Sequence, residues 1–297
     1  ITIKHNLVNS SGSLVLVYLC GMKVEGVALG TLIAQYAGFL MGIVLWMHNY
    51  GRLKRFWEIK NYKLKIKGGE GAGIWEKGAM FRFFQVNRDI FLRTLCLVAV
   101  TLFFTSAGAS QGEIILAVNT LLMQLFTLFS YVMDGLAYAG EALSGRYIGA
   151  RNREAFTDTV RHLFGWGAVI AVLFTLVYAL GGNAFLGLLT DDKEVIAVAD
   201  TYFYWALAVP AVGIAAFIWD GIFIGATATR GMLLSMAAAA VSFFILYYGL
   251  HPVLANHALW LAFLTYLLMR GVVQTGLSRE VIRRAFPSKK EPAWREG

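Results

Sequence analysis

Two aspartates and an arginine interrupt long apolar stretches of this sequence, and they are the side chains best placed to do chemistry. Asp134 lies in "YVMDGLAYAG", Asp220 in "FIWDGIFIGA" and Arg270 in "YLLMRGVV". A charged side chain in hydrocarbon costs at least ~2.5 kcal/mol, so such residues generally pair, couple to an ion or bind a substrate. The pattern predicts that Arg270 pairs with Asp134 or Asp220. Arg270→Ala is then destabilising, and an added Asp→Asn change relieves part of the loss.

Three further charges stand where another apolar run begins. Arg88, Asp89 and Arg93 occur in "NRDIFLRT", and we expect them to form one polar cluster with the three charges named above. Three interpretations of this cluster remain open. It is a structural pairing between helices, a group that couples directly to a transported ion or substrate, or simply a set of side chains exposed at the membrane interface.

The composition indicates that lipid surrounds most of the chain. Of the 297 residues, 58% are hydrophobic and only 15% are charged, with a mean hydropathy of +0.62. Soluble domains carry roughly 25% charged residues. The net charge of +8 does not predict nucleic-acid binding, because the basic residues fall in a few blocks between apolar segments. The isolated Cys20 and Cys96 predict neither a disulfide nor a metal site.

Eight segments are long and apolar enough to cross a membrane, which takes about 20 residues at about 1.5 Å each. The sequence therefore predicts an all-α, polytopic membrane bundle of about eight helices. The predicted spans are about 5–22, 24–49, 88–109, 112–139, 159–181, 200–224, 231–250 and 257–277.

Lysine and arginine are distributed unevenly over the connections between these spans. With segment 50–82 on the cytoplasmic side, alternation places 140–158, 225–230 and the C-terminal tail on that side too, where most of the basic residues fall. The outer connections carry only Lys23 and Lys193. This positive-inside bias predicts a multi-pass protein of the cytoplasmic (inner) membrane, with the linker and the C-terminus in the cytoplasm.

The basic, glycine-rich segment 50–82 has the composition of a flexible tether between two membrane units. We therefore predict four parts. Residues 1–49 hold two helices, 50–82 form a cytoplasmic linker, 83–277 hold six helices, and 278–297 form a basic cytoplasmic tail.

Several side chains are candidates to line a substrate cavity, because methionine and aromatic groups accept flat cations of varied shape. They fall in the predicted span 112–139 and are Asn119, Met123, Gln124, Phe126, Phe129 and Met133. Packing against lipid or against neighbouring helices is the alternative. Pro210, in "WALAVPAVGIAAF", removes a backbone hydrogen bond in mid-span and is either a hinge for alternating access or an ordinary kink.

Four stretches carry a family resemblance: "NRDIFLRT" (87–94), "DGLAYAGEALSGRYIGARN" (134–152), "DGIFIGATATRGM" (220–232) and "NHALWLAF" (256–263). In their order and spacing they resemble the multidrug and toxic compound extrusion (MATE) transporters, specifically the DinF-like branch, from end to end of the chain. The resemblance implies twelve helices in two six-helix lobes. This chain would then hold the last two helices of the N-lobe and the whole C-lobe, and we expect four spans to precede Ile1.

The resemblance also implies a function. Such proteins are secondary active antiporters, not enzymes, that export organic cations, drugs or toxic amphipathic compounds in exchange for H⁺ or Na⁺, with no other cofactor. The family's principal coupling aspartate lies in the absent spans. Its Asn-x-x-x-Asp pattern falls here on Asn9 and Ser13, and its threonine on Thr31. Because a serine stands where the acid often is, we expect proton coupling or an altered site.

Two other functions stay open. A related flippase for lipids or lipid-linked oligosaccharides needs a larger, more cationic cavity, whereas Arg93 and Arg270 are the only deep cations in the predicted spans. An intramembrane enzyme needs clustered acids or histidines, whereas the one acidic pair, Asp191 and Asp192, lies in a predicted outer loop. The partners we expect are membrane lipids and small organic cations, with the protein a monomer that does not bind nucleic acid.

Overall fold

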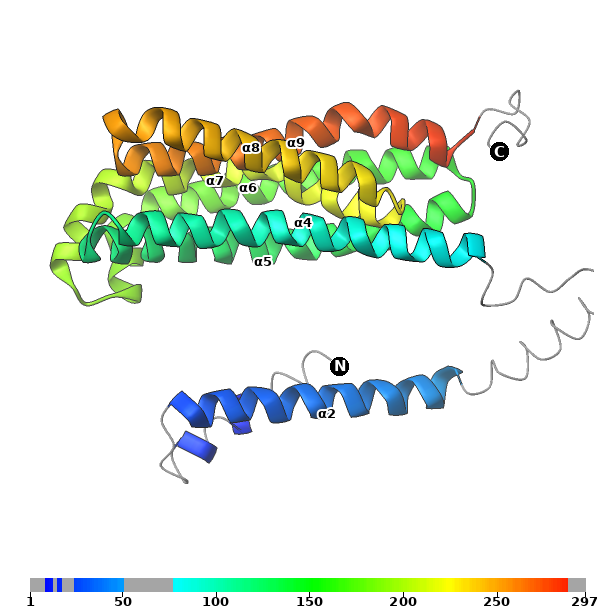
Figure 1. Ribbon diagram of the computed structural model, residues 1–297, viewed down its shortest axis with the longest axis horizontal. Helices are drawn as coiled ribbons and strands as arrows, with labels where there is room; N and C mark the ends of the chain where they lie inside the picture. The colour runs from blue at the N-terminus through cyan, green and yellow to red at the C-terminus, as the bar shows by residue number, and fades with distance from the viewer. Residues whose placement is uncertain (1–8, 13–14, 18–23, 51–76, 288–297) are drawn as a thin grey trace, which may run out of the picture. The chain divides into compact units, whose positions relative to one another are not determined.

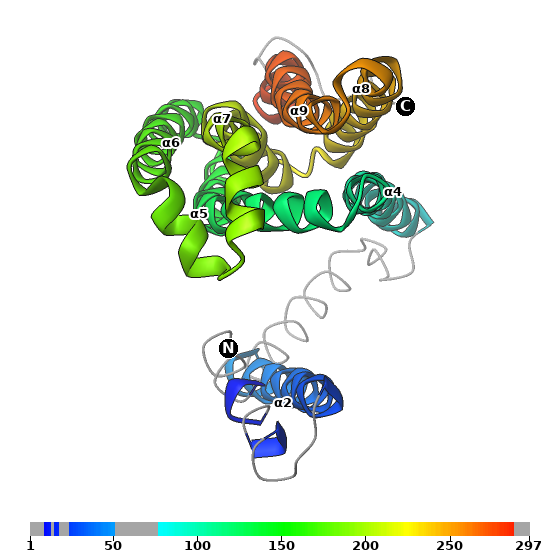
Figure 2. The same ribbon diagram turned by 90° about the vertical axis from the view of Figure 1, so that its left-hand side faces the viewer.

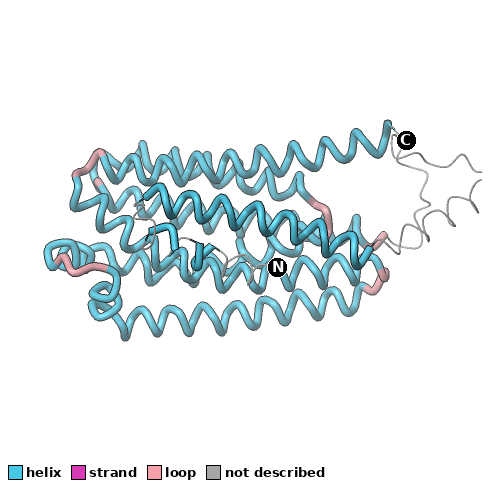
Figure 3. Tube along the Cα trace, turned by 90° about the horizontal axis from the view of Figure 1, so that it is seen from below, coloured by secondary structure: helices cyan, strands magenta, loops and turns pink. Residues whose placement is uncertain are grey.

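The structure is a computed structural model that describes residues 9–12, 15–17, 24–50 and 77–287 (Figure 1). These residues form helices and short turns without any strand, as Figure 3 shows in cyan and pink. The long helices are α2 (Val24–Tyr50), α4 (Lys77–Ala109), α5 (Glu113–Gly149), α6 (Arg153–Leu189), α7 (Lys193–Gly225), α8 (Thr229–Leu254) and α9 (Asn256–Ala285).

All seven long helices are long and apolar enough to cross a membrane. They correspond to seven of the eight predicted spans, and the fold is the predicted all-α, polytopic bundle. The remaining predicted span, 5–22, lies mostly outside the described residues. Most of the predicted linker and the end of the tail also lie outside them, while residues 77–82 belong to helix α4 and residues 278–285 to helix α9.

Several helices extend beyond the predicted spans, and polar caps begin two of them. Helix α5 continues ten residues past position 139 to Gly149, and the turn that follows contains Arg151 with a φ of 53°. The side chain of Asn152 then accepts a hydrogen bond from the backbone N–H of Ala155 and starts α6. Asp192 caps α7 in the same way.

The chain divides into two compact units, residues 1–79 and 80–297. In the first unit, the short helical piece at residues 9–12 packs against α2. A Cβ atom on Gly12 would lie 3.8 Å from the Cα atom of Gly30, so two glycines meet at this contact. Small residues at such a crossing let membrane helices approach closely.

The second unit is a bundle of six helices joined by short turns, so that consecutive helices run antiparallel. The view along the bundle shows α7 between α5 and α6 on one side and α9 on the other (Figure 2). Helices α7 and α9 are the most deeply buried of the seven spans. Helix α8 packs along α9.

Glycines bring the central helices of this unit into backbone contact. A Cβ atom on Gly221 of α7 would collide with the backbone carbonyl group of Ala137 on α5, and one on Gly225 with that of Glu141. On the other side of α7, a Cβ atom on Gly271 of α9 would meet the α7 backbone. Helices α5 and α9 therefore both approach α7 closely at these glycines.

Helix α4 is attached differently, because its backbone makes few close approaches to the other described helices. Its main contacts run through long side chains. The Phe103 ring makes edge contacts with four aromatic rings of α8, those of Phe243, Phe244, Tyr247 and Tyr248. The Phe104 ring packs against Trp260 and Phe263 of α9.

Two helix irregularities lie at the end of the bundle opposite the 150–152 turn. Gly182, with φ 36° and ψ −125°, breaks α6, and Ala255, with φ 45°, forms the tight turn between α8 and α9. Pro210, by contrast, is buried in an uninterrupted α7. A backbone break therefore occurs at Gly182 and not at Pro210, whose function as a hinge stays a prediction.

The contact between α5 and α7 leads to a stability prediction. Gly221→Ala places a methyl group against the Ala137 carbonyl group, and we expect overpacking to lower the free energy of unfolding by about 1–3 kcal/mol. Thermal or denaturant unfolding of the purified protein measures this change. Gly135→Ala is the matched control, because nothing lies within 4 Å of a Cβ atom at that position. Equal stability of the two variants would contradict the close-contact interpretation.

Candidate functional site

The Asp220 carboxylate is the centre of a polar cluster that joins three helices. Its Oδ2 atom accepts a hydrogen bond from Arg93 on α4 at 2.5 Å and another from Arg270 on α9. Its Oδ1 atom accepts a third from the Nε2 atom of Gln274, at 2.6 Å, also on α9. One side chain of α7 thus binds α9, which packs against it, and α4, which it reaches through the long Arg93 side chain. We call Asp220, Arg93, Arg270 and Gln274 the Asp220 cluster.

The Asp220 cluster is largely shielded from solvent. The side-chain exposure is 10% for Asp220, 8% for Arg270 and 20% for Arg93, and Gln274 is fully buried. A buried ion pair is destabilised strongly when one partner is removed, because the remaining charge is left without compensation. As long as the two guanidinium groups are buried, they need the Asp220 carboxylate to compensate their charge.

A second carboxylate lies near the cluster. Two arginines and one aspartate leave one positive charge, and the partly buried Asp134 on α5 lies within electrostatic reach of Arg270 and Asp220. No direct ion pair joins Asp134 to Arg270 in the described part of the chain. Of the two partners predicted for Arg270, the structure thus places Asp220 in direct contact and Asp134 close by.

Sequence spacing on α9 explains how the cluster is assembled. Arg270 and Gln274 are four residues apart and lie on one face of the helix, toward Asp220. Gly271, next to Arg270, lets this face approach α7. A second bond across the same pair of helices runs from the Trp219 indole N–H to the hydroxyl group of Thr275 at 2.8 Å.

Three polar atoms of the Asp220 cluster are buried without a hydrogen-bond partner among the described residues. They are the Nε atoms of Arg93 and Arg270 and the Oε1 atom of Gln274. A buried polar atom without a partner costs about 1–3 kcal/mol, so these three atoms lower the stability that the cluster contributes.

Arg88 and Asp89 do not join the Asp220 cluster, so the prediction of one cluster of six charges is wrong for these two residues. They form an ion pair with each other at 3.0 Å, with Asp89 buried and Arg88 largely exposed. The reason is local. The neighbouring Arg88 satisfies the Asp89 carboxylate within the same turn of α4, while Arg93, further along the helix, extends to α7.

Sequence reasoning missed a second buried polar group, which joins α5 to α9. The side-chain amides of Asn119 and Asn256 exchange two hydrogen bonds, at 2.8 and 2.9 Å, and the Trp260 indole N–H donates to the Asn119 oxygen at 2.8 Å. Asn119 was predicted to line a cavity, but the structure places it inside the bundle with these partners. An asparagine at the start of α9, spaced four residues from a tryptophan, was the available signal.

The other predicted cavity residues also lie mostly in the packed interior of the second unit. Phe129 and Met133 have no exposed surface. Phe126 packs against the rings of Phe217 and Phe263, and Met123 is partly buried against the same core, whereas Gln124 is exposed. Phe129 and Met133 therefore face other side chains, not open space, in this conformation.

The predicted ion-coupling residues lie in the first unit. The Thr31 hydroxyl group donates a hydrogen bond to the Asn9 side-chain oxygen at 3.2 Å, which joins the 9–12 piece to α2. Ser13 lies outside the described residues. In the described part of the chain no group of three His, Cys, Asp or Glu side chains is placed to hold a metal ion.

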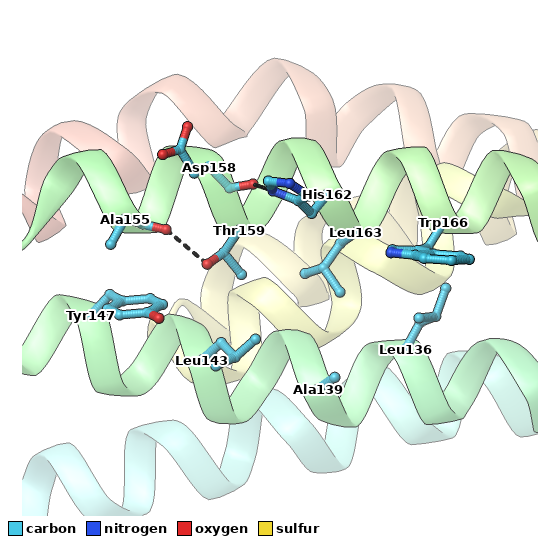
Figure 4. A pocket seen from close by; sticks show the side chains of 10 residues that line it. All are labelled: Leu136, Ala139, Leu143, Tyr147, Ala155, Asp158, Thr159, His162, Leu163 and Trp166. Atoms are coloured by element: carbon cyan, nitrogen blue, oxygen red, sulfur yellow. Dashed lines mark hydrogen bonds between the residues drawn. The ribbon is translucent and has the colours of Figure 1, made fainter.

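A groove of about 510 Å³ lies between α5 and α6 (Figure 4). Helix α5 contributes one wall and α6 the other, and the lining is mainly apolar with polar groups from α6. The lining residues are Leu136, Ala139, Leu143, Tyr147, Ala155, Asp158, Thr159, His162, Leu163 and Trp166.

The geometry of the Asp220 cluster leads to a double-mutant prediction. Asp220→Asn leaves two guanidinium groups without their carboxylate, and we expect the free energy of unfolding to fall by about 3–5 kcal/mol. Arg270→Ala should cost less, because Arg93 and Gln274 still bind Asp220. A variant that carries both Asp220→Asn and Arg270→Ala should lose less free energy of unfolding than the sum of the two single losses, because the two residues share one interaction.

Unfolding of the purified variants in denaturant gives these free energies. Glu280→Gln is the control, because Glu280 is an exposed carboxylate paired with Arg283 and Arg284 on the surface of α9. This change should leave stability unchanged. Strictly additive losses at Asp220 and Arg270 would show that the two side chains do not depend on each other.

Comparison with known proteins places this architecture in a family. The sequence pattern of the MatE family matches residues 90–253, more than half of the 297 residues. The chain is 39% identical over 251 residues, 84% of its length, to DNA damage-inducible protein F of Escherichia coli (strain K12), of which it covers 52%.

More distant similarity extends to plant proteins. The chain is 26% identical over 133 residues, 45% of its length, to Protein DETOXIFICATION 45, chloroplastic, of Arabidopsis thaliana, of which it covers 24%. It is 20% identical over 262 residues, 87% of its length, to Protein DETOXIFICATION 42 of the same plant, of which it covers 47%. The chain thus spans about half or less of the length of these relatives. The family match and the apolar helices together show that the chain belongs to the MATE family.

Proposed function

We propose that this chain is part of a secondary active transporter that exports organic cations or similar amphipathic compounds in exchange for H⁺ or Na⁺. The observation that carries the proposal is the MatE match over residues 90–253, which covers α5, α6 and α7, all but the last residue of α8, and α4 from Ile90 onward. The names of the plant relatives, which refer to detoxification, accord with export of harmful compounds.

The proposed mechanism is alternating access, in which two membrane lobes move about a central site. A ligand shifts such an equilibrium only by its difference in affinity for the two states. A bound proton or sodium ion and an exported cation therefore oppose each other when each favours a different state. In this scheme the exported compound leaves on the side where the coupling ion enters.

The Asp220 cluster supports a conformational function in this scheme. It binds α4 to α7 and α9 through side chains, while the α4 backbone makes few close approaches to other described helices. We propose that α4 changes its position during transport and that the Arg93–Asp220 pair is exchanged in the process. Asp134, close to Arg270, provides a second carboxylate for the guanidinium groups when that pair opens.

For the coupling ion, we propose H⁺ ahead of Na⁺. Asn9 and Thr31, joined by their hydrogen bond, supply neutral oxygen atoms only. Ser13 replaces the acid of the family pattern, which leaves this part of the site with less charge to balance a sodium ion. The cytoplasmic (inner) membrane, with the linker and C-terminus in the cytoplasm, is the location we propose from the distribution of basic residues.

A flippase remains the second candidate, and no contact in the structure favours it. Pyrophosphate-linked lipids need free cationic side chains within the membrane. The deep cations of the described helices, Arg93 and Arg270, both bind Asp220.

A transport assay tests the proposal directly. Cells that lack their own efflux pumps and express the full-length gene should accumulate less ethidium than cells with an empty vector. Dissipating the proton gradient should restore accumulation, whereas removing the sodium gradient should not. Equal ethidium accumulation with and without the protein would argue against drug export and in favour of the flippase.

The conformational function of Asp220 has its own test in the same assay. Asp220→Asn should lower the initial efflux rate to about a tenth or less of the parent rate, which corresponds to a barrier higher by about 1.4 kcal/mol. Glu280→Gln should retain the parent rate, because its ion pairs are exposed. Membrane levels of both variants are compared by immunoblot. Full efflux by Asp220→Asn at an equal membrane level would exclude this function.

A further inference from the structure

Two tryptophan side chains of α7 each donate a hydrogen bond to α9, at different points along the contact between these helices. Late in both helices, the Trp219 indole N–H binds the hydroxyl group of Thr275 at 2.8 Å. Early in both helices, the Trp205 indole N–H binds the Nδ1 atom of His257 at 3.1 Å. The two acceptors differ in their chemistry, because an imidazole group can take up a proton between about pH 5 and pH 8 and a hydroxyl group cannot.

The hydrogen bonds of His257 determine the state of its ring in this structure. An indole N–H can only donate, so the Nδ1 atom of His257 is an acceptor and carries no proton. The hydroxyl oxygen of Tyr204 lies 3.0 Å from the same Nδ1 atom and shares its single lone pair with Trp205. The neutral ring then keeps its proton on Nε2. The contact between Trp205 and His257 is therefore made by the unprotonated form of the imidazole group.

The direct neighbours of His257 are neutral groups. The rings of Tyr202 and Tyr204 lie 4.7 and 6.1 Å from the imidazole ring, between their centroids, and the side chains of tyrosines titrate only near pH 10. No hydrogen bond, ion pair or ring contact joins His257 to a titratable side chain of α5 or α8 in the described part of the chain. The other titratable or charged groups toward this end of α5, α7 and α8 are Glu113, residues 191–194, Asp200, Tyr247, Tyr248 and His251.

A proton on Nδ1 changes both hydrogen bonds of His257. The ring then has N–H donors on both nitrogens, and the Trp205 N–H faces another donor instead of a lone pair. A hydroxyl group can accept as well as donate, so the Tyr204 oxygen is able to receive the new Nδ1–H. The bond from Trp205 is lost, whereas the contact with Tyr204 is kept with its direction reversed.

We propose that Trp205, Tyr204 and His257 form a pH switch, in which proton uptake by His257 replaces its hydrogen bond from Trp205 with one to Tyr204. Acidification then loosens the contact between α7 and α9 at one end only, because the bond from Trp219 has an acceptor that does not titrate in this range.

The switch lies where protons outside the cytoplasm can reach it. Tyr204, Trp205 and His257 are at the end of the bundle opposite the 150–152 turn, which the distribution of basic residues predicts to be the outer end. The Tyr204 side chain is half exposed, and His257 is only partly buried. The switch is a property of this helix contact, and it does not depend on the proposed transport function.

Nuclear magnetic resonance of the protein in detergent, labelled with ¹⁵N-tryptophan, tests this proposal. Each indole N–H gives one resonance, and Trp205→Phe and Trp219→Phe identify the two of interest. Between about pH 8 and about pH 5, the Trp205 resonance should move as its hydrogen bond is lost, while the Trp219 resonance stays in place. A Trp205 resonance that does not move would overturn the switch. Movement of both resonances together would overturn its restriction to one end.

Three variants separate proton uptake by His257 from other effects of acid. His257→Gln cannot titrate in this range, so its Trp205 resonance should be independent of pH, whereas His251→Gln, at the same end of α8, should keep the parent response. Tyr204→Phe removes the acceptor of the protonated ring, so the midpoint should fall by about one pH unit, a tenfold weaker proton affinity. A pH response that persists in His257→Gln or disappears in His251→Gln would contradict the assignment to His257. An unchanged midpoint in Tyr204→Phe would contradict the function of Tyr204.

Discussion

The position of one carboxylate group determines how the helices of the second unit are arranged. Asp220 lies on α7, in the middle of the bundle, and binds Arg93 of α4 and Arg270 of α9 through the same oxygen atom. Two guanidinium groups in a low-dielectric interior repel each other and lose their hydration. Only a shared anion makes their positions compatible, so α4, α7 and α9 must bring these residues to the same depth.

The backbone contacts around α7 make this arrangement possible. Gly221 and Gly225 allow α5 to lie against one side of α7, and Gly271 allows α9 to lie against the other. Short side chains such as that of Asp220 can then reach their partners across the helix boundary. The amide pair of Asn119 and Asn256 forms a second polar link, with α5 bound to α9 near the opposite end of the bundle.

Much of this architecture follows from the sequence, because hydrocarbon imposes strong rules on composition. The spans and the need of Arg270 for an acidic partner were predictable, since both follow from the cost of polar groups in lipid. The Arg88–Asp89 pair was not, because spacing alone does not say which of two nearby partners an aspartate takes. The burial of Phe129 and Met133 depends on which face of α5 meets α7. Apolar side chains occur on every face of α5, so the sequence pattern does not identify that face.

The attachment of α4 by long side chains has a mechanical consequence. Helices α5 and α9 each lie in close contact with the α7 backbone, so we expect the three helices to move together as one rigid body. The rings around Phe103 and the Arg93 guanidinium group, by contrast, can change rotamer and follow a helix that slides or rolls by a few ångströms. The second unit therefore combines a rigid group of helices, α5, α7 and α9, with a less tightly held α4, and deformation of the unit concentrates at α4.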